Sequence, residues 1–254
     1  MRRLLPLLAL AVIVSGCATS QAMREPRSIL QSGLVEDPKE AGRLEKKLTD
    51  KDIAALLDAD IRAKVPTNLA IAGISEWCGW NYYEQRCGVI VPGAEELQRW
   101  KTLVEGVPHI NGVMPVTSLS TGVRHPKVYD LRTAAANMGC ELLLVYYVTD
   151  CALDNYTDAA ALYWTFVGLW VAPGNMYEHR TVIQSIVVDC RTGVILGTAT
   201  GDGHLKAACP AAYGKLQQDK LAEGARKKVM DDLLKGCKPL LKAIVSKAEQ
   251  PRRG

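Results

Sequence analysis

The sequence lacks the short motifs that identify most hydrolases, nucleotide-binding proteins and metalloproteases. It contains no G-x-S-x-G nucleophile elbow, no Walker phosphate loop and no H-E-x-x-H zinc motif. The stretch Gly201-Asp202-Gly203 lacks the third glycine of a nucleotide-binding loop, and we interpret it as a turn. The four histidines are scattered along the chain. The sequence therefore predicts no catalytic residue, no metal site and no cofactor.

The chain also lacks a strong excess of charge of either sign. Its 254 residues include 31 Lys and Arg against 27 Asp and Glu, which gives a formal net charge of +4. A charge so close to balance argues against a nucleic-acid partner. After the N-terminal segment, no stretch reaches 18 uncharged apolar residues, so no transmembrane helix is predicted.

The first seventeen residues have the pattern of an export signal. A basic start is followed by an apolar run from Leu4 to Val14, which is too short to span a bilayer, and then by two small residues. The stretch Val14-Ser15-Gly16-Cys17 resembles the lipobox of bacterial lipoproteins, in which the cysteine is lipidated and becomes the first residue after cleavage. An ordinary signal peptide with an incidental cysteine is the alternative.

The lipobox resemblance implies how the N-terminal region is organised. Residues 1–16 are then a signal peptide, Cys17 is the lipid anchor, and residues 17–48 are a polar tether. Ala18, where an Asp would follow the cysteine of an inner-membrane lipoprotein, implies the outer membrane. We therefore expect a protein of the cell envelope that faces the periplasm and is held firmly by several acyl chains.

Lipidation of Cys17 leaves seven other cysteines, which is an odd number. Export permits disulfides, and eight residues between Cys78 and Cys87 make a loop that a disulfide closes easily, so we predict this pair. Free thiols are one alternative, and a metal site is another, although structural zinc usually binds cysteines two to four residues apart. The connectivity of five cysteines stays open: Cys140, Cys151, Cys190, Cys209 and Cys237.

Distance excludes two pairings among these five. Cys140 and Cys151 flank a predicted strand and would lie roughly 35 Å apart, whereas the Cα atoms of a disulfide lie within about 7 Å. Cys209 and Cys237 flank a predicted helix of similar length, although glycines could bend it. Cys151 is the first candidate for the nucleophile of a thiol enzyme, but a structural cysteine is the favoured interpretation.

Apolar periodicity predicts one α/β domain over residues 49–248 and a short tail over 249–254. The order of elements favours a mixed sheet, parallel in its first part with an antiparallel C-terminal hairpin, and with helices packed on it. We predict helices over 53–61, 94–105, 126–138 and 213–235, and a short last helix from Pro239. We predict strands over 68–74, 113–119, 142–148, 181–189 and 194–200, and an aromatic-rich loop over 75–92.

The longest apolar run after the signal is AAALYWTFVGLWVAPG, residues 159–174. It is too short to span a membrane as an ordinary helix. A buried helix or strand pair is the favoured interpretation. The alternative is a surface that contacts lipid or a protein partner, because four large aromatic side chains lie close together in it: Tyr163, Trp164, Phe166 and Trp170.

The domain resembles the α/β domains of bacterial envelope lipoproteins and related proteins. The segments AAANMGCELLLVYYV and VIQSIVVDCRTGVILGTATG resemble the small-residue helix, central strand and D-x-x-T-G turn of three families. These are the curli-secretion lipoprotein, the lipoprotein activators of penicillin-binding proteins, and the amino-terminal domain of TolB. The resemblance implies a non-enzymatic role with an envelope-protein or cell-wall partner; a lipid-anchored periplasmic hydrolase or thiol enzyme is the alternative.

Overall fold

The computed structural model describes residues 61–78, 85–123 and 126–249. The predicted signal peptide, Cys17, the tether and nearly all of the first predicted helix lie outside these residues, as does most of the C-terminal tail.

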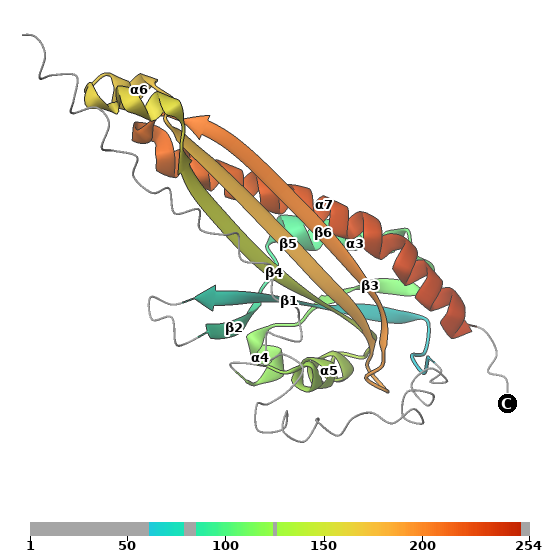
Figure 1. Ribbon diagram of the computed structural model, residues 1–254. Coiled ribbons are helices and arrows are strands. Elements are labelled where there is room, and N and C mark those ends of the chain that lie inside the picture. The colour runs from blue at the N-terminus through green and yellow to red at the C-terminus, as the bar shows by residue number, and fades with distance from the viewer. Residues whose placement is uncertain (1–60, 79–84, 124–125, 250–254) are drawn as a thin grey trace, which may run out of the picture.

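One mixed six-stranded sheet runs through the protein (Figure 1). Its strands follow the order β2-β1-β4-β5-β6, and β3 pairs with β1. β1 is parallel to β3 and β4, whereas the pairs β1–β2, β4–β5 and β5–β6 are antiparallel. The predicted α/β class, with a parallel first part and an antiparallel hairpin at the end, is confirmed. The strands are β1 Thr67–Cys78, β2 Gln85–Ile90, β3 Ile110–Pro115, β4 Cys140–Tyr156, β5 Asn175–Asp189 and β6 Ile195–Cys209.

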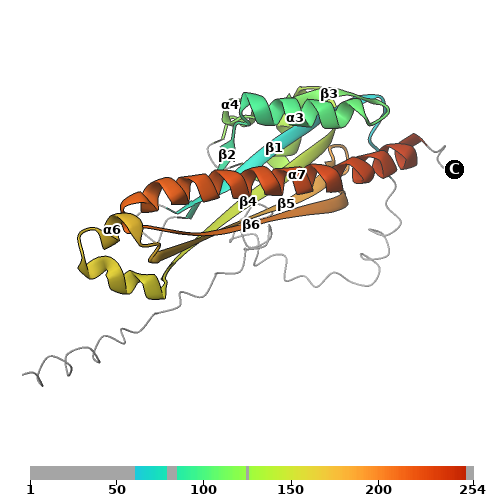
Figure 2. The ribbon, with the colours of Figure 1, turned by 90° about the horizontal axis from the view of Figure 1, so that it is seen from above.

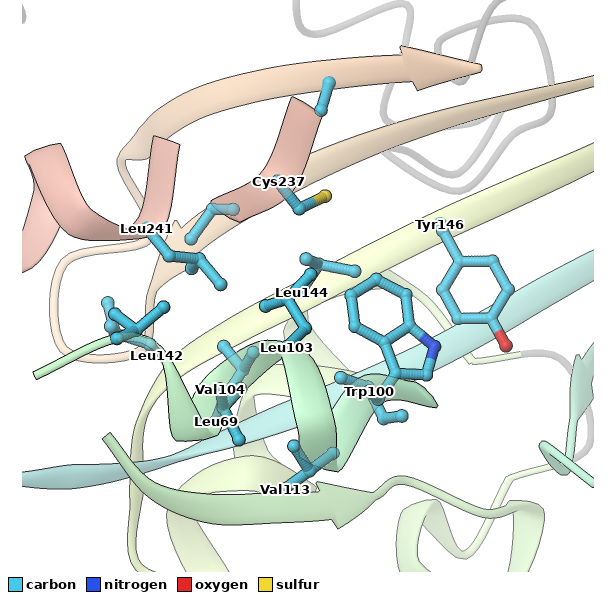
Figure 3. Packing of buried hydrophobic residues seen from close by; sticks show 14 of the residues in the cluster. Leu69, Trp100, Leu103, Val104, Val113, Leu142, Leu144, Tyr146, Cys237 and Leu241 are labelled. Atoms are coloured by element: carbon cyan, nitrogen blue, oxygen red, sulfur yellow. The ribbon is translucent and has the colours of Figure 1, made fainter. Parts of the chain in front are cut away.

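Helices cover both faces of part of the sheet (Figures 1 and 2). α3 and α7 pack on one face, where Trp100, Leu144, Leu233 and their neighbours form the larger core cluster (Figure 3). α5 packs on the other face against a second cluster that includes Leu131 and Leu143. The helices are α3 Ala94–Glu105, α4 Ser118–Thr121, α5 Val128–Asn137, η1 Asp158–Trp164, α6 Gly168–Val171, η2 Ala211–Tyr213 and α7 Gly214–Glu249, of which η1 and η2 are 3-10 helices.

The predicted helix over 94–105 is confirmed as α3, and that over 126–138 as α5. In α3, acidic residues occupy the first turn, where they interact favourably with the helix dipole, and Gly106 follows the last residue. In α5, the carboxylate of Asp130 accepts a hydrogen bond from the backbone N–H of Lys127. Gly139 follows with φ of 73°, a left-handed conformation that glycine adopts without strain.

Two predictions at the edge of the sheet are wrong. Residues 75–92 are not a loop throughout, because β1 continues to Cys78 and pairs with β2. The sequence does not predict these strands, because residues 75–92 mix polar and aromatic side chains. They lack the continuous apolar run that is typical of a strand buried on both faces. The strand predicted over 113–119 runs instead from Ile110 to Pro115, and Thr117 and Ser120 form a reciprocal capping box that starts α4.

α7 is one continuous helix of 36 residues, so the predicted break at Gly236 and Pro239 is also wrong. A proline inside a helix removes a backbone hydrogen bond and usually kinks or ends the helix. Here the buried stripe continues on both sides of Pro239, with Leu233 and Cys237 before it and Leu241 after it, all fully buried. Tertiary packing therefore outweighs the local preference of the proline.

Glycines on β6 allow α7 to approach the sheet closely. Gly201 and Gly203 lie in the middle of this strand, so their interpretation as a turn is wrong. A Cβ atom on Gly201 would collide with the backbone carbonyl of Val229, and one on Gly203 with that of Ala225. The alternating glycines therefore leave room for the backbone of the helix on the face of the strand.

The D-x-x-T-G segment forms the turn between β5 and β6, as the predicted hairpin requires. Gly193 has φ of 76° and donates its N–H to the carbonyl of Asp189 at 2.8 Å. The side chain of Asp189 is fully buried and accepts hydrogen bonds from the backbone N–H groups of Arg62 and Ala63 at 2.6 and 2.9 Å. It therefore ties the segment that precedes β1 to this turn.

Three strands continue far beyond the rest of the sheet (Figure 1). β1 pairs with β4 only as far as Val148. Beyond that point β4, β5 and β6 pair only with one another, through the register Thr149, Val182 and Asp202. We call this extension the arm (residues 149–182 and 202–213 and the first turns of α7), and we call the remainder the body. The strands predicted over 142–148, 181–189 and 194–200 correspond closely to the body portions alone.

Candidate functional site

The apolar segment 159–174 forms the outer end of the arm (Figure 1). It consists of most of η1, then α6, and the connection into β5. The two strands that lead into it are joined below it by a hydrogen bond from the N–H of Thr157 to the carbonyl of Gly174, at 2.8 Å. Gly168 is buried, and a Cβ atom there would collide with the carbonyl of Leu162. The segment is therefore a tightly folded end to the arm.

Most of its large side chains point into solvent. Trp164 is 93% exposed, Phe166 78% and Trp170 50%. The interpretation of this segment as a buried helix or strand pair is therefore wrong for these three residues. Tyr163 differs, because its ring packs against Gly174 and its hydroxyl donates a hydrogen bond to Oδ1 of Asn175 at 3.2 Å. Tyr163 holds the segment together, whereas the other three aromatic residues form its surface.

Aromatic contacts join this segment to the start of α7. The ring centroids of Phe166 and Trp170 are 6.4 Å apart, and those of Trp170 and Tyr213 are 6.2 Å apart in an edge-to-face arrangement. We call the whole exposed group the aromatic tip. It comprises Tyr156, Leu162, Trp164, Phe166, Val167, Trp170, Val171, Tyr213 and Leu216.

The segment that supplies most of the aromatic tip is also free of charged side chains. No charged residue occurs between Asp158 and Glu178, so the segment itself carries no ionisable acid or base apart from tyrosine hydroxyls. Large apolar side chains gathered on a surface are typical of sites that contact another molecule or a membrane. We interpret the tip as the candidate functional surface of the described part of the chain.

The sequence did not reveal the contribution of α7 to the tip. The apolar spacing of the helix predicted over 213–235 would place Leu216 on its buried face, but Leu216 is 54% exposed. Tyr213 lies between Pro210 and the helix and was assigned no role. The only signal in the sequence is that both are large apolar residues before the first buried leucine of α7, Leu221.

A polar network lies at the point where the arm leaves the body. Asp150 accepts hydrogen bonds from Oγ1 of Thr181 and from the guanidinium of Arg226, both at 2.6 Å, and His179 lies 3.3 Å away. Partial burial by itself would raise the pKa of Asp150, but the hydrogen bonds from Arg226 and Thr181 outweigh it and lower the pKa. The network links β4, β5 and α7.

Two further histidines, His204 and His109, also contact carboxylates. His204 lies 2.6 Å from Glu178 in the arm, and His109 lies 2.6 Å from Glu249 near the end of α7. No group of three or more metal-binding side chains that could hold an ion occurs among the described residues.

The structure describes the side chains of five cysteines: Cys140, Cys151, Cys190, Cys209 and Cys237. All five carry thiols rather than disulfides, so none of the open pairings is formed. Burial raises the pKa of each thiol, to about 12 for Cys190 and about 11 for Cys237. A raised pKa disfavours the reactive thiolate, which argues against Cys151 as a nucleophile.

Cys78 and Cys87 lie on neighbouring strands at the end of the β1–β2 pair. Cys78 pairs with Gln85, and Cys87 pairs with Glu76, so the two cysteines are diagonal in the ladder. The structure describes the backbone of these two cysteines but not their side chains. A disulfide between them therefore stays a prediction.

Within the described residues, we find no helix that is both long enough and apolar enough to span a bilayer. No protein-family model and no curated protein sequence matches the chain.

Several solved structures are similar in fold. PelC from Paraburkholderia phytofirmans, described as a dodecamer, is 12% identical over 70% of this chain and 90% of its own, with a TM-score of 0.35. The lipoprotein GNA1162 from Neisseria meningitidis is 12% identical over 61% of this chain and 96% of its own, with a TM-score of 0.31. A homologue of the neuraminyllactose-binding hemagglutinin from Helicobacter pylori is 10% identical over 73% of this chain and 96% of its own, with a TM-score of 0.34. At these identities and TM-scores the similarities carry no assignment of family or function.

Proposed function

We propose that this protein is a non-enzymatic lipoprotein of the bacterial cell envelope that makes a second contact with a lipid bilayer through its aromatic tip. The exposure of Trp164, Phe166 and Trp170 at the outer end of the arm is the observation that carries this proposal. In the proposed arrangement, the lipid on Cys17 anchors the chain to the outer membrane on its periplasmic side, and the tip touches the membrane at a second point.

The chemistry of the tip fits a bilayer interface. Tryptophan and tyrosine are enriched where membrane meets water, because their rings are apolar and carry one polar group. Burial of a side chain such as Trp164 or Phe166 contributes about 1.5 to 3 kcal/mol when it is complete. Residues 159–177 contain no charged side chain that would have to be desolvated, and the exposed Lys215 beside Leu216 has a long side chain that keeps its ammonium in water.

The shape of the tip also favours lipid over a protein partner. The apolar side chains come from two short helices and the start of α7, at the narrow end of the arm (Figure 1). A protein–protein interface of ordinary size buries about 800 Å² on each partner and needs a matching surface. A fluid lipid interface adapts to a small convex end. A lipid anchor on the same chain would also keep the tip close to the bilayer. Its high effective concentration there allows even a weak second contact to form.

The proposal is tested by binding of the chain to lipid vesicles without its own anchor. The chain from residue 18 onward, which lacks both the predicted signal peptide and Cys17, is mixed with phosphatidylethanolamine–phosphatidylglycerol vesicles and floated on a density gradient. We expect binding, and we expect Trp164→Ser with Phe166→Ser to weaken it roughly a hundredfold, since two buried aromatic side chains are lost.

A matched control is available in the body. Leu119 on α4 is 93% exposed, as is Trp164, but it is not part of the tip. We expect Leu119→Ser to leave vesicle binding unchanged. Absence of vesicle binding by the chain from residue 18 onward, together with crosslinking of residue 166 to an envelope protein, would replace the lipid contact with a protein partner.

A further inference from the structure

α3 and α7 lie next to each other on the same face of the sheet (Figure 2). An ion pair between Arg99 of α3 and Asp231 of α7 bridges the two helices. On either side of this bridge the surface is hollowed. The first hollow has a volume of about 580 Å³ and lies toward the arm, and the second has a volume of about 550 Å³ and lies along the later turns of both helices. Arg99 lines both hollows, so they lie on the two sides of one side chain, and we call the pair the interhelical groove.

The two hollows carry opposite charge. Apart from the bridging pair, four carboxylates and two basic side chains line the first hollow, which gives it an excess of two negative charges. The carboxylates belong to Glu95, Glu96, Asp150 and Glu223, and the basic groups to Arg226 and Lys227. The charged residues that line the second hollow, apart from the same pair, are Lys235 and Lys238, which gives it an excess of two positive charges.

Part of this charge has no partner in the described part of the chain. Among the described residues, no ion pair or hydrogen bond involves the side chains of Glu95, Glu223 or Lys238. Lys235 contacts Asp232, but both side chains are exposed, so the pair is weak. The remaining carboxylates of the first hollow are already engaged, Asp150 by Arg226 and Glu96 by the hydroxyl of Tyr146.

The first hollow has an apolar base between its charged walls. Side chains of Tyr146, Val148 and Ile183 from the sheet and Met230 from α7 line it. Tyr146 is held in place from two sides, because its hydroxyl donates to Glu96 and its ring lies directly over Gly73, where a Cβ atom would collide with it. A ligand in this hollow therefore meets apolar surface below and carboxylates at the rim, as in many peptide-binding clefts.

We propose that the interhelical groove binds an extended peptide segment that is basic at one end, apolar in its middle and acidic at the other end. The basic end lies over the first hollow, near Glu95 and Glu223, and the acidic end lies over the second, near Lys235 and Lys238. The apolar residues next to the basic end lie over the apolar base of the first hollow, and the peptide then crosses the Arg99–Asp231 bridge to the second hollow. Charge complementarity along the groove sets the direction in which the peptide binds.

The experiment uses two blocked peptides of the same composition, each labelled with fluorescein and titrated into the full chain while anisotropy is measured. The first, Lys-Lys-Leu-Ala-Gly-Leu-Glu-Glu, separates its charges. The second, Lys-Glu-Leu-Ala-Gly-Leu-Lys-Glu, mixes them. We expect the first peptide to bind at least fivefold more tightly at low salt, and we expect the difference to shrink as salt screens the charges.

Variants then locate the site. We expect E95Q with E223Q, and separately K235Q with K238Q, to weaken binding of the first peptide roughly tenfold, because each removes two exposed charge contacts. The matched control is E105Q with K242Q, which removes exposed charges from the same two helices outside both hollows. This control should bind as the unaltered chain does.

Three results would overturn the proposal: no binding of the first peptide, equal binding of both peptides, or equal weakening by the control and the groove variants. The proposal does not depend on the aromatic tip. Trp164→Ser with Phe166→Ser should retain peptide binding, so the failure of one proposal is distinguishable from the failure of the other.

Discussion

The body and the arm share the three strands β4, β5 and β6, but helices cover these strands differently in the two regions. In the body, β4 is buried on both faces, between α3 and α7 on one side and α5 on the other, from Leu142 to Tyr147. In the arm, α7 is the one described helix that packs along the strands, and the other face carries polar pairs such as Arg180 with Asp202 and Glu178 with His204. The body is thus a closed two-sided core, whereas the arm is a one-sided extension that ends in exposed aromatic residues.

The difference indicates a division of roles. Core residues of the body determine whether the chain folds, because their burial supplies most of the favourable free energy. The tip contributes little to stability, so its apolar residues are explained by contact with something outside the chain. Four predictions test this division, from the largest expected effect on stability to the smallest.

The body should be the most sensitive region. Trp100 is fully buried and packs on Tyr146, with ring centroids 5.9 Å apart (Figure 3). We expect Trp100→Ala to lower the free energy of unfolding by about 3 to 5 kcal/mol, through lost burial and the cavity left behind. Its indole N–H has no hydrogen-bond partner among the described residues, so Trp100→Phe should cost less. Urea denaturation of the two variants measures both effects, and an equal loss for both would contradict this account of the site.

The contact between α7 and β6 should be the next most sensitive feature. We expect Gly201→Ala to destabilise the protein by about 2 kcal/mol, because the new Cβ atom would push the helix away from the strand. Gly236→Ala, on the helix side, is the control: its Cβ atom would meet that of Ala199 at 3.5 Å, an ordinary contact. Alanine is also the better helix former, so this variant should be neutral or stabilising in the same urea experiment. Destabilisation by both to the same degree would argue against the close approach of α7.

The Asp150 network should contribute less than either. The pKa of Asp150 is lowered in the folded state, so its contribution is present above the pKa of the unfolded chain and is lost as the pH falls through the folded value. We expect Asp150→Asn to cost about 1 kcal/mol at pH 7, because its side chain is 28% exposed and solvent screens part of the attraction. Thermal unfolding from pH 7 to pH 3 should show the gap between variant and parent closing below about pH 4. A stability difference between parent and variant that does not change with pH would show that the ionised carboxylate of Asp150 is not its cause.

The tip should be the least sensitive region. We expect Trp164→Ser to change the free energy of unfolding by no more than about 0.5 kcal/mol, as for other exposed substitutions. A loss of 2 kcal/mol or more in urea denaturation would mean that the ring packs against the fold in solution, and the division between body and tip would be wrong.

The difference between body and arm also explains which parts of the fold the sequence predicts. The pattern LLLVYYV at 142–148 predicts a strand because it is buried on both faces and therefore continuously apolar. The continuation of β4 through residues 149–156 is polar on one face and mostly exposed, so it lacks this signal, and the arm was missed. Residues 159–174 were assigned to the core because apolar residues are usually buried. Only the three-dimensional position of the segment, at the end of an arm with no further layer to cover it, shows that Trp164 is exposed.

The interhelical groove could not be found from the sequence for a different reason. Glu95 and Glu223 are separated by more than a hundred residues and look like ordinary solvated charges on two helices. They become one site because α3 and α7 pack on the same face of the sheet. Charge on a single helix is visible in the sequence, but charge across two helices depends on the topology.

The most direct test of the central claim, that the tip enters a bilayer, is quenching of tryptophan fluorescence by brominated lipids in vesicles. The account predicts that the chain from residue 18 onward is quenched and that Trp164→Phe with Trp170→Phe removes most of the quenching, while Trp100 in the core contributes none. Equal quenching of the parent and the double variant, or no quenching of either, would contradict it.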